Sequence, residues 1–328
     1  MEQKDFHGMR LLAQSIRRRI MDVVHKNGGH LASNLGIVEL MVALHKTFHF
    51  PDDKLLFDVS HQCYAHKLLS GRDGDAFDLL RKDGGLCGFC NPSESPWDIF
   101  HVGHAGTALS SALGLAASRD RRKGNEHIIA LLGDGSLTCG LTWEAMQWVR
   151  QTTERLIIII NDNGFSIDPT GGAIGAHLEK LRHGKVAAKN SLFQHMGMDY
   201  HGPIDGHCLE NLVDSLEYAR TKACPQVIHV VTKKGYGDRD AEMFPADFHG
   251  ICGKERQKEE IFSDSLSYYG ELCGRALCQL AEMDERIVAI TAAMRIGTGL
   301  SPFAEKFPER FFDVGIGESH AVTFAAAM

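Results

Sequence analysis

The sequence has no long apolar run, no excess of positive charge and no internal repeat, and each absence narrows what the chain can be. None of its segments approaches the roughly 20 consecutive apolar residues that a membrane-spanning helix needs. The formal net charge of -7 and the pI near 6.2 argue against a general affinity for nucleic acid or for an anionic membrane surface. The composition therefore predicts no nucleic-acid partner and no membrane partner.

The sequence also lacks a secretory signature. Its N-terminal segment is polar and has no apolar signal-peptide core. Nine cysteines form an odd and scattered set without a disulfide framework, which favours a reduced, cytoplasmic setting. Cys87 and Cys90 make one CxxC, but a zinc site of that kind needs a second pair. We interpret these two thiols as incidental, with a redox or metal role as the alternative.

The order of the predicted elements favours an α/β fold with a mostly parallel sheet flanked by helices. Apolar runs predict strands at 55–59, 127–132, 156–160, 226–231, 286–291 and 311–314. Helical periodicity predicts helices at 6–26, 35–48, 104–119, 141–150 and 262–283, with a further short helix ending at 70. The charged stretch 254–260 looks like a linker between two domains.

The most informative pattern is Gly133-Asp134-Gly135, followed one helix length later by Asn161-Asp162-Asn163. Each triplet ends an apolar strand, and a strand, helix and strand within about 35 residues make a βαβ unit. Ligands of such sheets bind at the carboxyl ends of the strands, where Asp134 and Asn163 are both expected. A carboxylate, an amide oxygen and a main-chain carbonyl would suit Mg²⁺, with diphosphate oxygens completing the shell. The alternative is a pair of ordinary turns.

Histidines gather at strand ends and helix starts within glycine-rich loops. Eighteen histidines is a high count, although each one alone is more often a surface or hydrogen-bonded residue. Imidazole suits proton relay near neutral pH and hydrogen bonding to phosphate. The candidates are His30, His104, His207 and His249, which lie beside glycines, and His61, which follows a predicted strand.

The paired triplets resemble the thiamin-diphosphate motif of the transketolase superfamily. Within it, GGHLASNLGIVELMVALH, DVSHQCYAHKLLSGR, GPIDGH and DVGIGESHAVTFAA resemble the 1-deoxy-D-xylulose-5-phosphate synthase family. The similarity covers nearly all of the sequence, and the last two runs separate it from ordinary transketolases. The resemblance implies a thiamin-diphosphate-binding fold. It implies a diphosphate-binding domain at 1–262 and, at 263–328, the first part of a pyrimidine-binding domain, which is an incomplete second α/β domain.

The resemblance also implies roles for individual residues. Mg²⁺ would be bound by Asp134, Asn163 and the main-chain carbonyl of Phe165. Thiamin diphosphate would lie near His61, Gly103, His104, Ala105, Gly133, Asp134, Gly135, Ser136, Asn163, Phe165, Lys234 and Glu318. The catalytic set would be Glu318, His30, His61, His104 and His249, the last at the phosphate end of the acceptor. Glu318 would hydrogen-bond the aminopyrimidine; by itself it could equally be an acid favoured at a helix N-terminus.

The implied reaction decarboxylates pyruvate and joins the two-carbon unit to glyceraldehyde 3-phosphate, giving 1-deoxy-D-xylulose 5-phosphate. The sequence departs from the family at three places, and each bears on whether this chain carries out the implied reaction. The sequence ends at Met328, so the remaining domains are expected outside it; the segment between 167 and 193 is short; and Ala105 and Gly106 replace serines. We expect a homodimer with little activity alone. The alternatives are a cofactor-binding subunit that needs a complementing C-terminal chain, or an inactive fragment.

Overall fold

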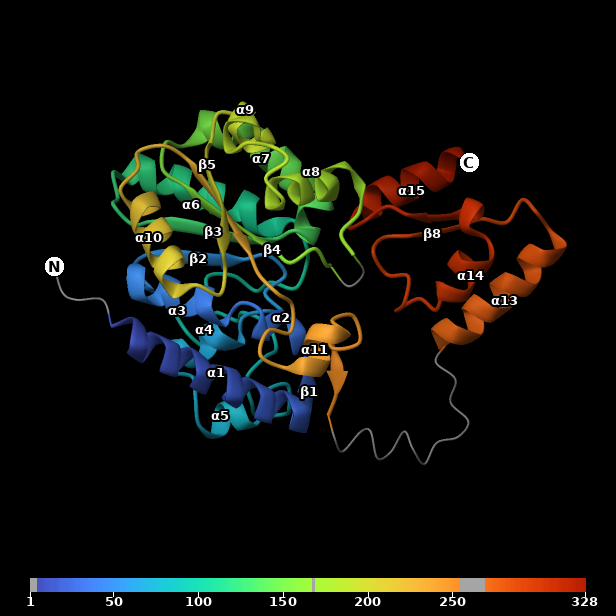
Figure 1. The fold of residues 1–328 in the computed structure, drawn as a ribbon, viewed down its shortest axis with the longest axis horizontal. Helices are drawn as coiled ribbons and strands as arrows, with labels where there is room; N and C mark the ends of the chain where they lie inside the picture. The colour runs from blue at the N-terminus through green and yellow to red at the C-terminus, as the bar shows by residue number, and fades with distance from the viewer. Residues whose placement is uncertain (1–4, 167–168, 254–268) are drawn as a thin grey trace.

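The computed structural model describes residues 5–166, 169–253 and 269–328. Its larger part is a five-stranded parallel sheet in the order β2-β3-β4-β6-β5, with helices on both faces (Figure 1). The α/β fold with a parallel sheet flanked by helices is therefore confirmed. The strands of this sheet are β2 (Lys54–Phe57), β3 (Ile128–Gly133), β4 (Ile157–Asp162), β5 (Asp199–Asp205) and β6 (Gln226–Val231).

Two sets of helices cover the two faces of the sheet. One face is covered by α1 (Phe6–Asn27), α3 (Val38–Thr47), α4 (Tyr64–Leu69) and α10 (Leu209–Arg220). The other is covered by α6 (Thr107–Arg122), α7 (Gly140–Thr152), α8 (Gly172–Arg182) and α9 (Leu192–His195). Short elements complete this part: β1 (Gly28–Gly29), α2 (Ala32–Leu35), α5 (Asp75–Asp78), η1 (Gly135–Thr138), η2 (Ala188–Asn190), α11 (Arg239–Met243) and β7 (Ile251–Cys252).

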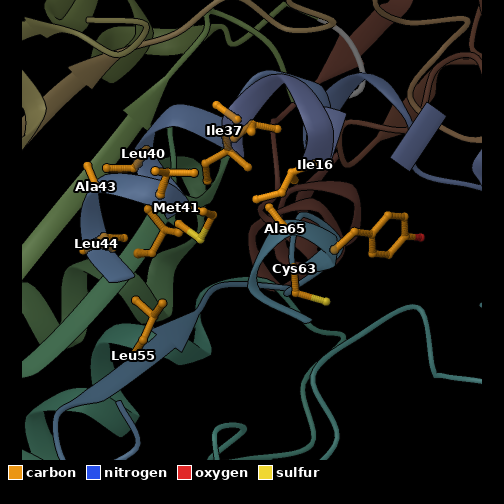
Figure 2. Close-up of a cluster of buried hydrophobic side chains, with 14 of the residues drawn as sticks. Ile16, Ile37, Leu40, Met41, Ala43, Leu44, Leu55, Cys63 and Ala65 are labelled. Carbon is orange, nitrogen blue, oxygen red and sulfur yellow. The ribbon is translucent and has the colours of Figure 1, made fainter. Parts of the chain in front are cut away.

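The apolar runs of β3 and β4 are unbroken because both faces of these strands are buried. In β3, Ile129 and Leu131 pack into the cluster under α3, whereas Ala130 and Leu132 pack into the cluster under α6 and α7. Fully burying a leucine or isoleucine side chain contributes about 1.5–3 kcal/mol, which explains the unbroken apolar pattern. Figure 2 shows the first cluster, where side chains of α1, α3, β2 and α4 gather.

The remaining described residues form a smaller α/β unit. Its strands β8 (Ala289–Thr291) and β9 (Phe311–Asp313) pair in parallel. Its helices are α13 (Tyr269–Met283), α14 (Ser301–Lys306), η3 (Pro308–Arg310) and α15 (Glu318–Ala327). Phe303 is fully buried in its small core, but α15 has no buried residue and Val322 is 72% exposed. Figure 1 shows α15 lying next to α8, and both helices line one cavity.

Several predicted elements differ from the structure. The helix expected from His104 begins at Thr107, because Gly106 has a positive φ of 83° and breaks the helical turn. The sequence pattern did not predict β5, α8 or α10. β5 is half polar and contains Gly202-Pro203, a combination that an edge strand tolerates.

Two predictions fall outside the described residues: the linker at 254–260 and the domain boundary between 262 and 263. The helix predicted from 262 is described only as α13. In the described ranges, no helix is both long enough and apolar enough to span a bilayer.

Candidate active site

The ends of β3 and β4 lie side by side and place the two triplets at one edge of the sheet. Gly133 pairs with Asn161, and the main-chain N–H of Asp134 donates to the Asn161 carbonyl over 3.1 Å. The Asp134 side chain is buried, with the Thr170 hydroxyl donating to its Oδ2 over 2.6 Å. Burial, aided by the nearby Asp162 carboxylate, raises the pKa of Asp134 to about 7. A divalent cation at this edge would stabilise the charged carboxylate.

Asn163 lies in the turn that follows β4. Its Oδ1 accepts the main-chain N–H of Phe165 over 3.1 Å, which brings the amide side chain next to the Phe165 peptide. The expected donor set has one carboxylate and two neutral oxygens. Among the described residues, no group of three or more His, Cys, Asp or Glu side chains offers a rival metal site. The assignment of Asp134, Asn163 and Phe165 to Mg²⁺ stays a prediction.

Gly135 must be glycine because the chain passes too close to the loop after β4. A Cβ at Gly135 would lie 2.8 Å from the Cβ of Ser166. For a Cβ at Gly133, the nearest atom would be the hydroxyl oxygen of Ser136, at 3.9 Å. The Ser136 hydroxyl is already committed, since it donates to Oδ1 of Asp58 over 2.6 Å. Only the backbone of Ser136 therefore remains available to a diphosphate.

Asp58 is a supporting residue that the sequence analysis did not single out. Its carboxylate accepts the main-chain N–H groups of Gly106 and Ala108 over 2.8 Å and 3.1 Å, besides the Ser136 hydroxyl. It thereby ties the end of β2 to the start of α6 and to η1. Burial raises the pKa of Asp58. Its place directly after a buried strand is the feature of the sequence that could have marked Asp58 as a site residue.

Three of the predicted histidines meet in one cluster. The rings of His30, His61 and His249 lie 5.2–5.3 Å apart, centroid to centroid, in all three pairings. Asn34 holds two of the loops together, because its Nδ2 donates to the carbonyls of His30 and His61 over 2.7 Å and 2.8 Å. The structure thus assembles these histidines from three segments that are far apart in the sequence.

Burial keeps this cluster neutral. Burial, together with the positive charges of Arg81 and Lys234, lowers the pKa of His30 to about 4. Burial and Lys234 lower the pKa of His249 to about 3, and burial drives that of His61 well below its usual value. His61 Nδ1 is a buried nitrogen without a hydrogen-bond partner among the described residues. A substrate hydroxyl could donate to it.

The loop that carries His61 is strained. Val59 and Ser60 both adopt positive φ values, 59° and 68°, which a β-branched residue rarely does. The main-chain N–H of Cys90 donates to the Ser60 hydroxyl over 3.0 Å, and Phe89 packs its ring 5.8 Å from His30. The loop with the CxxC therefore covers the histidine cluster. Backbone strain of this kind often occurs at functional sites.

Lys234 connects the histidine cluster with the sheet edge. Its side chain is buried, and Nζ donates to the main-chain carbonyl of Ser166. Its positive charge acts on the histidines described above and also lowers the pKa of Asp134 against the larger effect of burial. Lys234 is thus placed between the predicted metal ligand and the predicted proton-transfer groups.

Two predicted catalytic residues lie elsewhere. His104 is exposed and lines a separate cavity of about 220 Å³ beside β2, which Gly103 also lines. Glu318 is exposed in the first turn of α15. Within the described parts of the chain, neither His104 nor Glu318 makes a hydrogen bond or ring contact with the histidine cluster.

The serine that the family resemblance leads us to expect at position 106 would not fit there. A Cβ at Gly106 would lie 2.4 Å from Sγ of Cys139, and the positive φ also favours glycine. The same Sγ approaches the carbonyl oxygen of Ala105 to 3.9 Å. The bulk of Cys139 thus occupies the space that a serine side chain would need.

A cavity of about 1290 Å³ lies between the sheet edge and the smaller unit. Gly135, Ser166 and Thr170 line one side, and His320 and Phe324 of α15 line the other. The two sides touch directly, because the main-chain N–H of Ile316 donates to the Thr138 hydroxyl over 2.8 Å. The cavity is large enough for a cofactor-sized molecule.

The arrangement of the strands is that of a transketolase. A transketolase from Campylobacter jejuni superposes with a TM-score of 0.63 and 17% identity, over 95% of this chain and 61% of that one. A transketolase mutant from Pichia stipitis gives a TM-score of 0.62 at 17% identity, over 92% of this chain and 47% of that one. At this identity, the likeness concerns the fold alone.

Sequence similarity shows the family to which the chain belongs. The family model for 1-deoxy-D-xylulose-5-phosphate synthase matches residues 1–191 and 184–232, and that for the transketolase pyrimidine binding domain matches 268–328. The chain is 42% identical to the synthase of Syntrophus aciditrophicus, over 99% of this chain and 56% of that protein. It is 44% identical to the synthase of Dictyoglomus thermophilum, over 98% of this chain and 57% of that protein. The chain belongs to the 1-deoxy-D-xylulose-5-phosphate synthase family, as its motifs indicated, and spans about 56% of the length of such relatives.

Proposed function

We propose that this chain takes part in the thiamin-diphosphate- and Mg²⁺-dependent synthesis of 1-deoxy-D-xylulose 5-phosphate from pyruvate and glyceraldehyde 3-phosphate. Family membership supports the reaction. The observation that carries the proposal is that buried Lys234 acts electrostatically both on buried Asp134 and on a cluster of histidines whose pKa values are lowered. Such an arrangement would combine a cation site with proton acceptors.

The residues at the sheet edge fit the cofactor. Asp134, Asn163 and the carbonyl of Phe165 would hold Mg²⁺, which prefers such oxygen donors. The diphosphate would lie along Gly133, Gly135 and the backbone of Ser136, where a close approach of the main chain is possible. Bound thiamin diphosphate supplies an electron sink for the two-carbon unit. Glu318 is the residue proposed to bind its aminopyrimidine.

The histidine cluster would serve the substrates. Neutral His30, His61 and His249 can accept hydrogen bonds from hydroxyl groups and take up protons when negative charge approaches. Pyruvate and glyceraldehyde 3-phosphate are both anions, and their charge would raise the low pKa values of these rings. The ammonium group of Lys234 would stabilise negative charge that develops nearby. The proposed role of His104, which lines a separate cavity, rests on the family resemblance alone.

A second candidate function is that of a cofactor-binding subunit that needs further protein. The exposed apolar surface of α15, with Val322 72% exposed and no buried residue in the helix, favours it. Either a homodimer partner or a complementing C-terminal chain could cover that surface. The isolated chain would then bind the cofactor but turn over weakly or not at all.

Two measurements on the purified chain test these proposals. Calorimetric titration with thiamin diphosphate and Mg²⁺ should give saturable binding that Asp134→Ala abolishes. Production of carbon dioxide from pyruvate should be weak, and should rise when the C-terminal part of a related synthase is added. Absence of saturable binding would contradict the cofactor proposal, and full synthase activity of the chain alone would contradict the need for further protein.

A further inference from the structure

Asp162, the middle residue of the second triplet, is the end point of a buried hydrogen-bond chain that crosses three strands. The hydroxyl of Tyr200 on β5 lies 2.7 Å from Nδ1 of His229 on β6. His229 Nε2 lies 2.8 Å from Oδ2 of Asp162 on β4. All three side chains are buried. Arg182, in the last turn of α8, donates to Oδ1 of Asp162 over 2.6 Å.

Both carboxylate oxygens of Asp162 are therefore in use. Oδ2 accepts from His229, and Oδ1 accepts from Arg182 and from the main-chain N–H of Gly164 over 3.1 Å. These three hydrogen bonds take up most of the acceptor capacity of the carboxylate. Although it is the one acid of its triplet, Asp162 is thus not placed as a metal ligand.

The bond to Gly164 shows what Asp162 does instead. Gly164 stands between Asn163 and Phe165, the two residues that would offer oxygens to Mg²⁺, and its φ of +77° closes the turn. Asp162 holds this turn through the Gly164 N–H, while Asn163 accepts the Phe165 N–H. The orientation of both predicted ligands therefore depends on where the Asp162 carboxylate is held.

The direction of the chain follows from its donors and acceptors. A carboxylate only accepts, so Nε2 of His229 donates to Asp162; with its one hydrogen there, the ring can accept from the Tyr200 hydroxyl at Nδ1. Burial and the charge of Asp162 raise the pKa of Tyr200, which keeps its hydroxyl protonated. Each link has one donor and one acceptor, and such satisfied buried networks fix side-chain positions.

We propose that Tyr200, His229 and Arg182 are positioning residues for the divalent cation: acting through Asp162, they fix the turn that presents Asn163 and Phe165. The inference rests on the metal site of the proposed function and adds residues from β5, β6 and α8 to it. In metal sites, removing a hydrogen-bond partner that stands behind the ligands typically weakens metal binding by about 10–100-fold.

The test is the affinity for Mn²⁺ in the presence of thiamin diphosphate, followed by calorimetry and by the electron paramagnetic resonance signal of free Mn²⁺. His229→Leu removes both links and should weaken Mn²⁺ binding by about 10–100-fold. In His229→Gln, the amide can donate to Asp162 and accept from Tyr200, so the affinity should stay within about threefold of the wild type. The melting temperature of each metal-free variant separates lost affinity from lost folding.

Two further variants complete the design. Tyr200→Phe removes only the hydroxyl that bonds to His229 and should weaken Mn²⁺ binding by at least about threefold. This variant tests the positioning role if His229→Leu does not fold. His201→Leu is the matched control: His201 is the next residue on β5, and its Nε2 lies 3.1 Å from the hydroxyl of Ser215 on α10, on the other face of the sheet. It should leave Mn²⁺ affinity unchanged.

The outcomes are distinguishable. Unchanged affinity in His229→Leu and Tyr200→Phe, with binding lost in Asp134→Ala, would overturn the positioning role and leave the metal site in place. Equal losses in His229→Gln and His229→Leu would also overturn it, because the amide preserves the hydrogen bonds. A wild-type chain that binds no Mn²⁺ would overturn the metal site together with this inference.

Discussion

The main-chain N–H of Lys233 donates to Nε2 of His207 over 2.8 Å, and this bond fixes the residue next to Lys234. Nδ1 of the same ring lies 3.3 Å from Oε2 of Glu39, which also accepts from Arg17. The ring of His207 stacks on Tyr236 with 3.6 Å between centroids. The GPIDGH run therefore acts on the site indirectly, by holding the turn that places Lys234.

Replacing His207 by phenylalanine should separate the effect of the hydrogen bond from Lys233 from that of stacking on Tyr236. The His207→Phe ring can still stack on Tyr236 but cannot accept from Lys233, so we expect a destabilisation of about 1 kcal/mol by urea unfolding. Affinity for thiamin diphosphate should fall as well, because Lys234 is less firmly placed. Lys233→Ala keeps the main-chain N–H and is the control. Equal cofactor affinity in both variants would remove His207 from the support of the site.

The histidine cluster predicts a pH dependence of stability. The folded pKa values of His30 and His249 are about 4 and about 3, below the ordinary value of 6.5. The unfolded chain therefore binds more protons as the pH falls below 6.5, and the free energy of unfolding should fall from there down to about pH 4 through His30 and about pH 3 through His249. Above 6.5 the two groups no longer affect the slope.

The double variant His30→Gln with His249→Gln tests this dependence. Urea unfolding over the range from about pH 4 to 7 should give a shallower loss of stability in the variant, since two of the titrating groups are gone. An identical slope in wild type and variant would contradict the neutral state of these rings in the folded chain.

The contact between Gly106 and Cys139 makes a further prediction. Gly106→Ser alone, which introduces the serine expected from the family resemblance, should destabilise the chain by about 1–3 kcal/mol, because of the positive φ and the clash with Sγ. Adding Cys139→Ala should recover part of this loss. Urea unfolding measures both variants.

A second glycine of the same helix serves as the control for that prediction. Gly114 lies inside α6, and a Cβ at this position would meet no other atom within 4 Å. Gly114→Ala should therefore raise stability by about 0.5–1 kcal/mol. If Gly106→Ser is as harmless as Gly114→Ala, the steric explanation of the missing serine is wrong.

The sequence predicted the centre of the sheet well, for a physical reason. β3 and β4 are buried on both faces, so their apolar runs are unbroken and their ends are marked by polar triplets. β5 escaped prediction because an edge strand carries weaker constraints and tolerates Gly202-Pro203. Local pattern therefore reveals strands only where burial is complete.

The candidate site was predicted in its parts but not in its assembly. His30 and His249 were predicted from glycine-containing loops and His61 from its place at a strand end, yet no spacing in the sequence shows that the three rings meet. Asp162 lies in the triplet that carries the predicted ligand Asn163, whereas its partners Tyr200 and His229 come from two other strands. Such relationships are set by the topology of the sheet and leave no local signature.

The most direct test of the account is the position of one bound ion. Crystals of the chain grown with thiamin diphosphate and Mn²⁺, measured at the manganese absorption edge, should give a single anomalous peak at the ends of β3 and β4. The account predicts an ion roughly 2.0–2.3 Å from oxygens of both Asp134 and Asn163. A peak bound to only one of these side chains, or located elsewhere, would contradict it.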